Sequence, residues 1–201
     1  FYLGGAPSQG VDLLNALSKT FPFVVILILF ITFLILVRTF QSILLSAKAI
    51  ILDLISIGIA FSALVVVFKF GVGTYQLEQI EAWVLILLFA ILFGLSMDYE
   101  IFIVSRIREA HDRGASNEEA IREGMRSSGT VVTAAALIFI SAVTGLATGH
   151  FAGLQQLGVG LAIGVIVDAT IIRGLLLPSA MVLLGRWNWW MPRHGKTPTL
   201  K

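Results

Sequence analysis

Five long runs of apolar residues constrain this sequence more than any other feature. A helix that crosses a bilayer needs about 20 mainly apolar residues, and such runs occupy 21–37, 49–68, 83–104, 129–149 and 151 to about 177. Only 13% of the residues are charged, against about 25% in an ordinary soluble domain. We therefore predict an all-α fold, a polytopic membrane helix bundle with five transmembrane helices.

The basic residues indicate how these helices are oriented. Five spans place the two ends of the chain on opposite sides of the membrane, and Lys and Arg gather in cytoplasmic connections. One side holds only Lys19 and Lys69. The other side holds Arg38, Lys48, Arg106, Arg108, Arg113, Arg122, Arg126, Arg186, Arg193, Lys196 and Lys201. We expect this second side to be cytoplasmic, with the N-terminus outside and the C-terminus inside the cell. Arg173 lies near the cytoplasmic end of the last span, where its side chain could reach the interface.

Several functional classes are disfavoured because the sequence lacks the residues and motifs that they need. A formal net charge of +2 is too small and too scattered for a nucleic-acid-binding surface. With no cysteine, there is no thiolate for a metal site or a nucleophile. The sequence contains no Walker loop and no H-E-x-x-H or G-x-S-x-G motif. We predict a protein that is not an enzyme and that holds no cofactor or metal.

The regions between and after the spans have recognisable signals. Between spans three and four, at about 105–128, Gly114 suits a helix C-cap, and Ser116 with Glu119 forms a capping box. This pattern predicts a cytoplasmic helical connector, in which His111 is an exposed bystander. The segment 186–201 is interpreted as an interfacial tail, because Trp187, Trp189 and Trp190 adjoin basic residues.

Asp98 is the strongest candidate for a functional residue. It follows Trp83 by 15 residues, about 22 Å along a helix, and precedes Arg106 by 8 residues, about 12 Å. A carboxyl group at such depth typically belongs to a proton or substrate pathway. Gly94, one turn earlier, lets a neighbouring helix approach the same face.

The fourth span carries a stripe of hydroxyl groups that could serve this carboxyl group. Its members are Thr130, Thr133, Ser141, Thr144 and Thr148. They either pack helices together or hydrogen-bond to a buried acid. We expect Ser141 and Thr144 to form a polar niche around Asp98.

Three further acids carry weaker predictions. Asp168 ends a face of small residues with Gly160 and Gly164, and Arg173 could form an ion pair with it. Asp53 is interpreted as a solvated acid or as the partner of Lys48. Glu100 points about 200° away from Asp98 around the helix, and the sequence gives it no role.

The segment GLSMDYEIFIVSRIREAHDRG, at 94–114, resembles the MMPL (mycobacterial membrane protein large) branch of the resistance-nodulation-division (RND) superfamily. The family's cytoplasmic turn and the helix after it resemble the segment RTFQSILLSAKAIILDLISIG. Its C-terminal helix and tail resemble VDATIIRGLLLPSAMVLLGRWNWWMP. FYLGGAPSQGVD resembles the last strand of the family's extracytoplasmic porter domain. The resemblance implies residues 1–20 as the end of that domain, 21–185 as the five-helix bundle and 186–201 as the cytoplasmic tail.

The resemblance also implies a function. Asp98 and Tyr99 match the Asp-Tyr pair that relays protons in this family, which exports lipids, lipopeptides, siderophores or amphiphilic drugs. Family members have about twelve spans, two porter domains and two such pairs. The chain is thus expected to be an RND-type half without its porter domain, whose partners are the bilayer, the N-terminal half, a lipid-like substrate and, as an open question, further copies of itself. The family usually has an amide at the position of Asp53.

Two alternatives from other classes were weighed. A five-helix unit of this kind also resembles the sterol-sensing domain, a lipid-binding module without transport, but a pure sensor has no need of a titrating acid at mid-depth. An intramembrane aspartyl protease built from Asp98 and Asp168 is disfavoured, because the sequence has DY in place of YD and lacks a GxGD motif.

Overall fold

The computed structural model describes residues 6–71 and 80–189 of the chain, and it confirms the predicted all-helical class. Five helical stretches are long and apolar enough to cross a membrane. They are α1 (Ala6–Phe40), α2 (Ile43–Leu64) continued by the π-helix η1 (Val65–Lys69), α3 (Ala82–Asp112), α4 (Asn117–Ala147), and α5 (Ala152–Val167) continued by the π-helix η2 (Asp168–Leu176) and by α6 (Leu177–Leu184). A short 3₁₀-helix, η3 (Gly185–Trp189), follows. The described ranges contain no strand.

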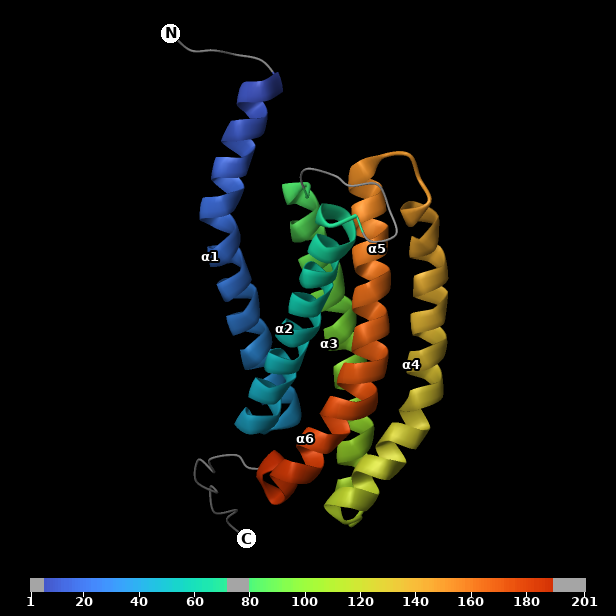
Figure 1. Cartoon of the computed structure of the whole chain (residues 1–201). Coiled ribbons are helices and arrows are strands. Elements are labelled where there is room, and N and C mark those ends of the chain that lie inside the picture. The colour runs from blue at the N-terminus through green and yellow to red at the C-terminus, as the bar shows by residue number, and fades with distance from the viewer. Residues whose placement is uncertain (1–5, 72–79, 190–201) are drawn as a thin grey trace.

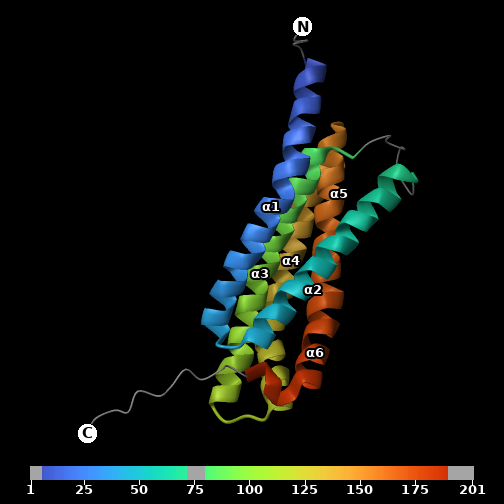
Figure 2. The same ribbon diagram turned by 90° about the vertical axis from the view of Figure 1, so that its left-hand side faces the viewer.

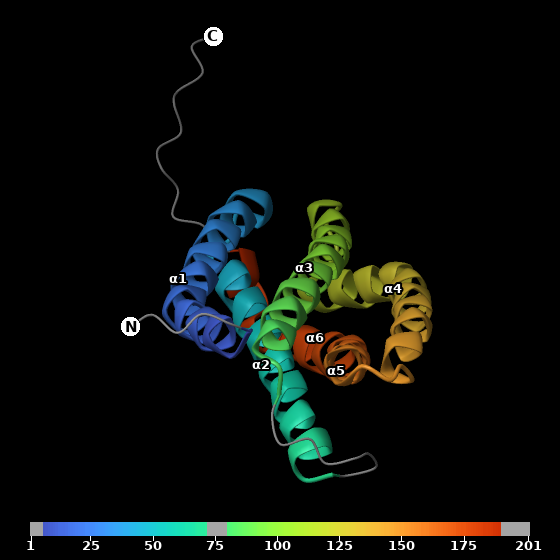
Figure 3. The same cartoon turned by 90° about the horizontal axis from the view of Figure 1, so that it is seen from above.

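The helices form a bundle in which α2, α3 and α5 lie between α1 and α4 (Figures 1 and 3). Helix α1 packs on α2 and α3 only along part of its length. Its N-terminal part stands apart from α2 in Figure 1 and extends beyond the ends of the other helices in Figure 2. One end of the bundle carries the α1–α2 and α3–α4 turns together with α6, and the other end carries the α4–α5 turn (Figure 1). The loops that the charge count assigns to one side of the membrane therefore lie at one end of the molecule.

Glycines allow the helices to approach closely at the centre of the bundle. A Cβ atom on Gly158 of α5 would lie 2.5 Å from the backbone nitrogen of Ala147 in α4. On Gly160 it would lie 3.0 Å from a methyl carbon of Leu88, and on Gly164 it would lie 2.5 Å from a methyl carbon of Leu92. The small face predicted from Gly160 and Gly164 is thus a contact between α5 and α3.

The turn between α3 and α4 follows the predicted capping signals. Gly114 has a φ of 98°, a left-handed conformation that glycine adopts without steric cost. The hydroxyl of Ser116 accepts from the backbone N–H of Glu119 at 3.3 Å, and the Glu119 carboxylate accepts from the backbone N–H of Ser116 at 3.2 Å. These reciprocal bonds start α4 and fix the helical connector.

Two features of the ends differ from expectation. The segment that resembles a strand is helical from Ala6 onward. Pro7 does not oppose this, because proline is tolerated in the first turn of a helix. In the tail, Trp187 is exposed, but Trp189 is half-buried and stacks on His111 with ring centroids 4.3 Å apart. His111 is therefore a packing partner of the tail and not an exposed bystander. Trp190 lies outside the described residues.

Candidate functional site

Asp98 lies on α3 in a groove between α1 and α3. The groove has a volume of about 390 Å³. Its lining comprises Ile28, Thr32, Ile35 and Leu36 of α1 and Phe89, Ala90, Phe93, Gly94, Met97, Asp98 and Ile101 of α3. Asp98 is exposed, and the groove around it is otherwise almost entirely apolar. Gly94 lies in this groove, on the same face as Asp98. The arrangement leaves a carboxyl group in the middle of a span, facing away from the core of the chain.

The structure does not build the niche that we expected from Ser141 and Thr144. Both residues are exposed on α4, and their hydroxyls donate to carbonyls of their own helix, Leu137 O at 2.8 Å and Ile140 O at 2.7 Å. The residues that line the groove of Asp98 come from α1 and α3. Helical periodicity correctly places the hydroxyls on one stripe, but it does not determine which neighbour that stripe meets.

Tyr99 turns away from Asp98 toward the last span. The guanidinium carbon of Arg173 lies 5.0 Å from the centre of the Tyr99 ring, which is a cation–π contact. Tyr99 thus stands between the open groove and a second, buried group of charges.

This buried group is centred on an ion pair between Asp168 and Arg173. The Nε of Arg173 lies 2.7 Å from Oδ2 of Asp168, and the two side chains are only 4% and 8% exposed. Residues five apart are offset by about 140° in an α-helix. In η2 the π-helical i→i+5 winding brings them to one face. Arg173 therefore points into the bundle and does not reach for the interface.

Ser96 of α3 connects the ion pair to α2. Its hydroxyl oxygen lies 2.7 Å from Nη2 of Arg173 and 3.0 Å from Oδ1 of Asp168, and it also contacts Oδ1 of Asp53. The backbone carbonyl of Ser96 accepts a further bond from Arg173. Asp53 is only 1% exposed, so it is not solvated. The Nζ of Lys48 has no hydrogen-bond partner, so Asp53 is not paired with this lysine either, and the expectation of a solvated or lysine-paired acid was wrong.

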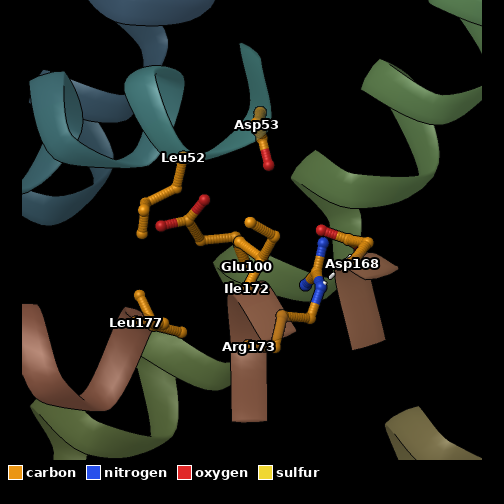
Figure 4. Close-up of a pocket in the computed structure, with 7 residues that line it drawn as sticks. All are labelled: Leu52, Asp53, Glu100, Asp168, Ile172, Arg173 and Leu177. Atoms are coloured by element: carbon orange, nitrogen blue, oxygen red, sulfur yellow. Dashed lines mark hydrogen bonds and ion pairs between the residues drawn. The ribbon is translucent and has the colours of Figure 1, made fainter. Parts of the chain in front are cut away.

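A narrow cavity brings Asp53 and Glu100 together with the ion pair (Figure 4). The cavity encloses about 160 Å³ and is too narrow for a water molecule. Glu100 is 4% exposed, and its Oε1 has no hydrogen-bond partner. Lys48 is also buried, close enough for its charge to act on Glu100, although the sequence places it in a cytoplasmic connection. Among the described residues, no group of three or more acids or histidines is arranged to hold a metal ion.

The sequence predicted an ion pair between Asp168 and Arg173, and the structure contains it. The roles of Asp98 and Tyr99 stay predictions. The sequence analysis did not predict that four further residues gather around the ion pair, namely Ser96, Asp53, Glu100 and Lys48. A signal for them does exist in the sequence. Asp53 and Glu100 are ionisable residues within apolar runs, and such residues usually face a bundle interior.

Comparisons with known proteins agree with the resemblance. The sequence model of the MMPL family matches residues 1–200. The chain is 37% identical over 195 residues to "Heme uptake protein MmpL11" of Mycobacterium tuberculosis strain H37Rv, covering 95% of this chain and 20% of that protein. It is 35% identical over 195 residues to "Mycolic acid-containing lipids exporter MmpL11" of Mycolicibacterium smegmatis, covering 95% and 20%.

A third relative, "Trehalose monomycolate exporter MmpL3" of Mycobacterium tuberculosis strain H37Rv, is 35% identical over 198 residues, covering 96% of this chain and 21% of that protein. The chain spans about a fifth of the length of these curated relatives. Its match to the family extends over almost every residue, including the helices that carry Asp98, Tyr99 and the buried cluster. The chain belongs to the MMPL family of membrane transport proteins.

Proposed function

We propose that this chain is the membrane half of an exporter driven by the proton-motive force, in which Asp98 takes up and releases the proton and Tyr99 assists. The observation that carries the proposal is the placement of Asp98. Its carboxyl group lies at mid-span in an apolar groove that is open on one side. A carboxyl group exposed to hydrocarbon is costly, so a second membrane half is the natural cover for it.

Tyr99 gives this site a route to the rest of the bundle. Its ring contacts Arg173, which in turn contacts Asp168 and Ser96. A change of charge at Asp98 would therefore act on Tyr99, the next residue, and through the cation–π contact of Tyr99 with Arg173 on η2. Such a link is what a transporter needs to convert proton binding into helix movement.

The proposed substrate class is amphiphilic and lipid-like. Two relatives are named as exporters of mycolic acid-containing lipids and of trehalose monomycolate.

The test uses the full-length protein in liposomes with an imposed pH gradient and a fluorescent trehalose fatty-acid ester as the transported probe. Asp98→Asn keeps the size and hydrogen bonding of the side chain but cannot cycle a proton. We expect it to reduce gradient-driven movement of the probe by about 100-fold or more. Tyr99→Phe, which removes only the hydroxyl, should cause a smaller reduction.

Asp112→Asn is the matched control, because it makes the same change on the same helix at an exposed position. It should transport at the wild-type rate. Wild-type transport by Asp98→Asn would refute the relay. Probe binding by the wild type without gradient-driven movement would instead favour a lipid-binding module.

A further inference from the structure

The hydroxyl of Ser96 has more partners than its single proton can serve. A serine hydroxyl donates one hydrogen bond and accepts two. Arg173 Nη2, which can only donate, occupies one acceptor position at 2.7 Å. One proton and one lone pair then remain for two carboxyl oxygens, Oδ1 of Asp168 at 3.0 Å and Oδ1 of Asp53 in closer contact.

Two ionised carboxylates cannot both be satisfied by this hydroxyl. If Ser96 donates its proton to one carboxylate, the oxygen of the other carboxylate lies against the hydroxyl oxygen of Ser96 with no proton between these two oxygens. If one carboxyl group is protonated, it donates to Ser96 while Ser96 donates to the other, and all three positions of the hydroxyl are filled. We propose that Asp53 and Asp168 share one exchangeable proton through Ser96, which forms a proton-binding site separate from Asp98.

The surroundings place the resting proton on Asp53. Asp168 accepts a hydrogen bond from the cationic Nε of Arg173 at 2.7 Å, so it already has a charged partner. Asp53 is almost completely buried, its Oδ2 has no partner, and it faces the negative charge of Glu100. Burial without a cationic partner favours the neutral carboxyl group.

The charges of the cluster balance with one bound proton. Asp53 faces Glu100 from α3 and Asp168 and Arg173 from η2, and Lys48 from α2 lies close to Glu100. With Asp53 neutral, two cations face two anions. With Asp53 ionised, the buried cluster carries one uncompensated negative charge, which is expensive away from water.

The ligand is a proton and not a metal ion. The cavity beside Asp53 is too narrow for a water molecule. The acids of the described chain are not grouped as metal ligands. A proton needs only the oxygen–oxygen contacts that are present.

The same contacts allow the proton to move. The Asp53 O–H bond breaks as its proton passes to Ser96 Oγ, and the original Ser96 proton passes to Oδ1 of Asp168. Asp53 becomes ionised and Asp168 neutral, with no other reactant. The Asp168–Arg173 attraction then weakens, and Arg173 contacts Tyr99. The role of this step in export rests on the proposed function, whereas proton binding itself does not.

The test is infrared spectroscopy of the full-length protein in lipid membranes during a pH titration. A protonated buried carboxyl group has a C=O stretching band that ionised carboxylates lack. We expect such a band near neutral pH, its reversible loss at alkaline pH, and its isotope shift in wild-type protein labelled with ¹³C-aspartate. Labelling needs no variant, so the test does not depend on how a substitution folds. Absence of the band, or no shift with labelled aspartate, overturns the proposal.

Variants then assign the band. Asp53→Asn should abolish it and Ser96→Ala should shift it, whereas Asp98→Asn should leave it in place. A band that survives Asp53→Asn and disappears in Asp98→Asn overturns this site but leaves the proposed relay standing. A band that behaves as expected, together with wild-type transport by Asp98→Asn, supports this site and refutes the proposed function.

Discussion

Arg173 shows how much of the site depends on one side chain. Its guanidinium pairs with Asp168 through Nε, binds Ser96 through Nη2 and lies over the ring of Tyr99. Arg173→Gln would leave the carboxylate of Asp168 buried without a cation. Breaking a buried pair by removing one partner costs about 3–5 kcal/mol. We expect a loss of that size in the free energy of unfolding, measured by denaturant titration of the full-length protein in detergent micelles.

The matched control is Arg106→Gln. Arg106 pairs with Glu109 at 3.2 Å, but both side chains are about half exposed, at 49% and 52%. Exposed pairs contribute about 0–1 kcal/mol, so this variant should unfold almost like the wild type. Equal effects of the two substitutions would show that the buried pair is not a structural centre of the bundle.

The depth of Asp98 could be predicted from the sequence, whereas the buried cluster around Ser96 could not. The depth of Asp98 follows from counting residues, because a straight helix has a fixed rise. The cluster around Ser96 does not follow, because it requires three facts that no local pattern contains. These are the rotation of α2, the rotation of α3, and the change from α- to π-helical winding at Asp168. Asp53 was misplaced for this reason, although its residue type was a signal.

Among the elements, the contact between α3 and α4 depends on one glycine. A Cβ atom on Gly124 of α4 would lie 2.7 Å from the backbone nitrogen and 2.8 Å from the Cα of Ile107 in α3. Backbone atoms cannot move aside as a side chain does. Gly124→Ala should therefore destabilise the protein by about 1–3 kcal/mol, as measured by thermal unfolding in micelles.

Gly129 on the same helix provides the control, because a Cβ atom there meets nothing within 4 Å. Alanine is favoured over glycine in a helix interior by up to about 1 kcal/mol. Gly129→Ala should thus be neutral or slightly stabilising. A loss of stability in both variants would mean that the effect is one of backbone conformation and not of close packing.

The tail is a second element whose role can be tested. Trp189 stacks on His111 and donates from Nε1 to Oδ1 of Asn117 at 3.3 Å, so η3 joins the ends of α3 and α4. Trp189→Ala should release this segment and speed its cleavage by trypsin several-fold, followed by mass spectrometry. Leu183→Ala, at a side chain that is 87% exposed, should leave the cleavage rate unchanged. Equal rates in both variants would contradict the docking role of Trp189.

The positions of the helices were predicted better than the partners against which the helices pack. All five spans and the capping box appear as expected, because hydrophobic run length and cap residues act locally. The packing partner of the hydroxyl stripe was predicted wrongly. The stacking of Trp189 on His111 was not predicted. A hydroxyl can satisfy itself within its own helix, as Ser141 does, and a tryptophan can stack on protein as well as lie in an interface. Composition alone does not choose between these outcomes.

At the scale of the whole molecule, burial is unevenly distributed. Only 6% of the apolar window of α1 is buried, against 44% for α3. The open groove that holds Asp98 lies between these two helices. This side is where we place the second membrane half under the proposed function, because it would cover both the groove and the bare face of α1.

The orientation of the molecule gives the last prediction. The end of α1 and the helix ends beside the α3–α4 turn carry the basic residues Arg38, Arg106, Arg108, Arg113, Arg122 and Arg126. Lys48 and Arg173 lie inside the bundle and do not count as loop charges. Since Lys and Arg are retained on the cytoplasmic side, Glu118 should face the cytoplasm and His150, in the α4–α5 turn, the outside. Both side chains are exposed. In a full-length protein otherwise free of cysteine, a membrane-impermeant maleimide added to intact cells should label His150→Cys, whereas Glu118→Cys should react only after the cells are opened. The reverse pattern would invert the bundle and place the α3–α4 turn outside the cell.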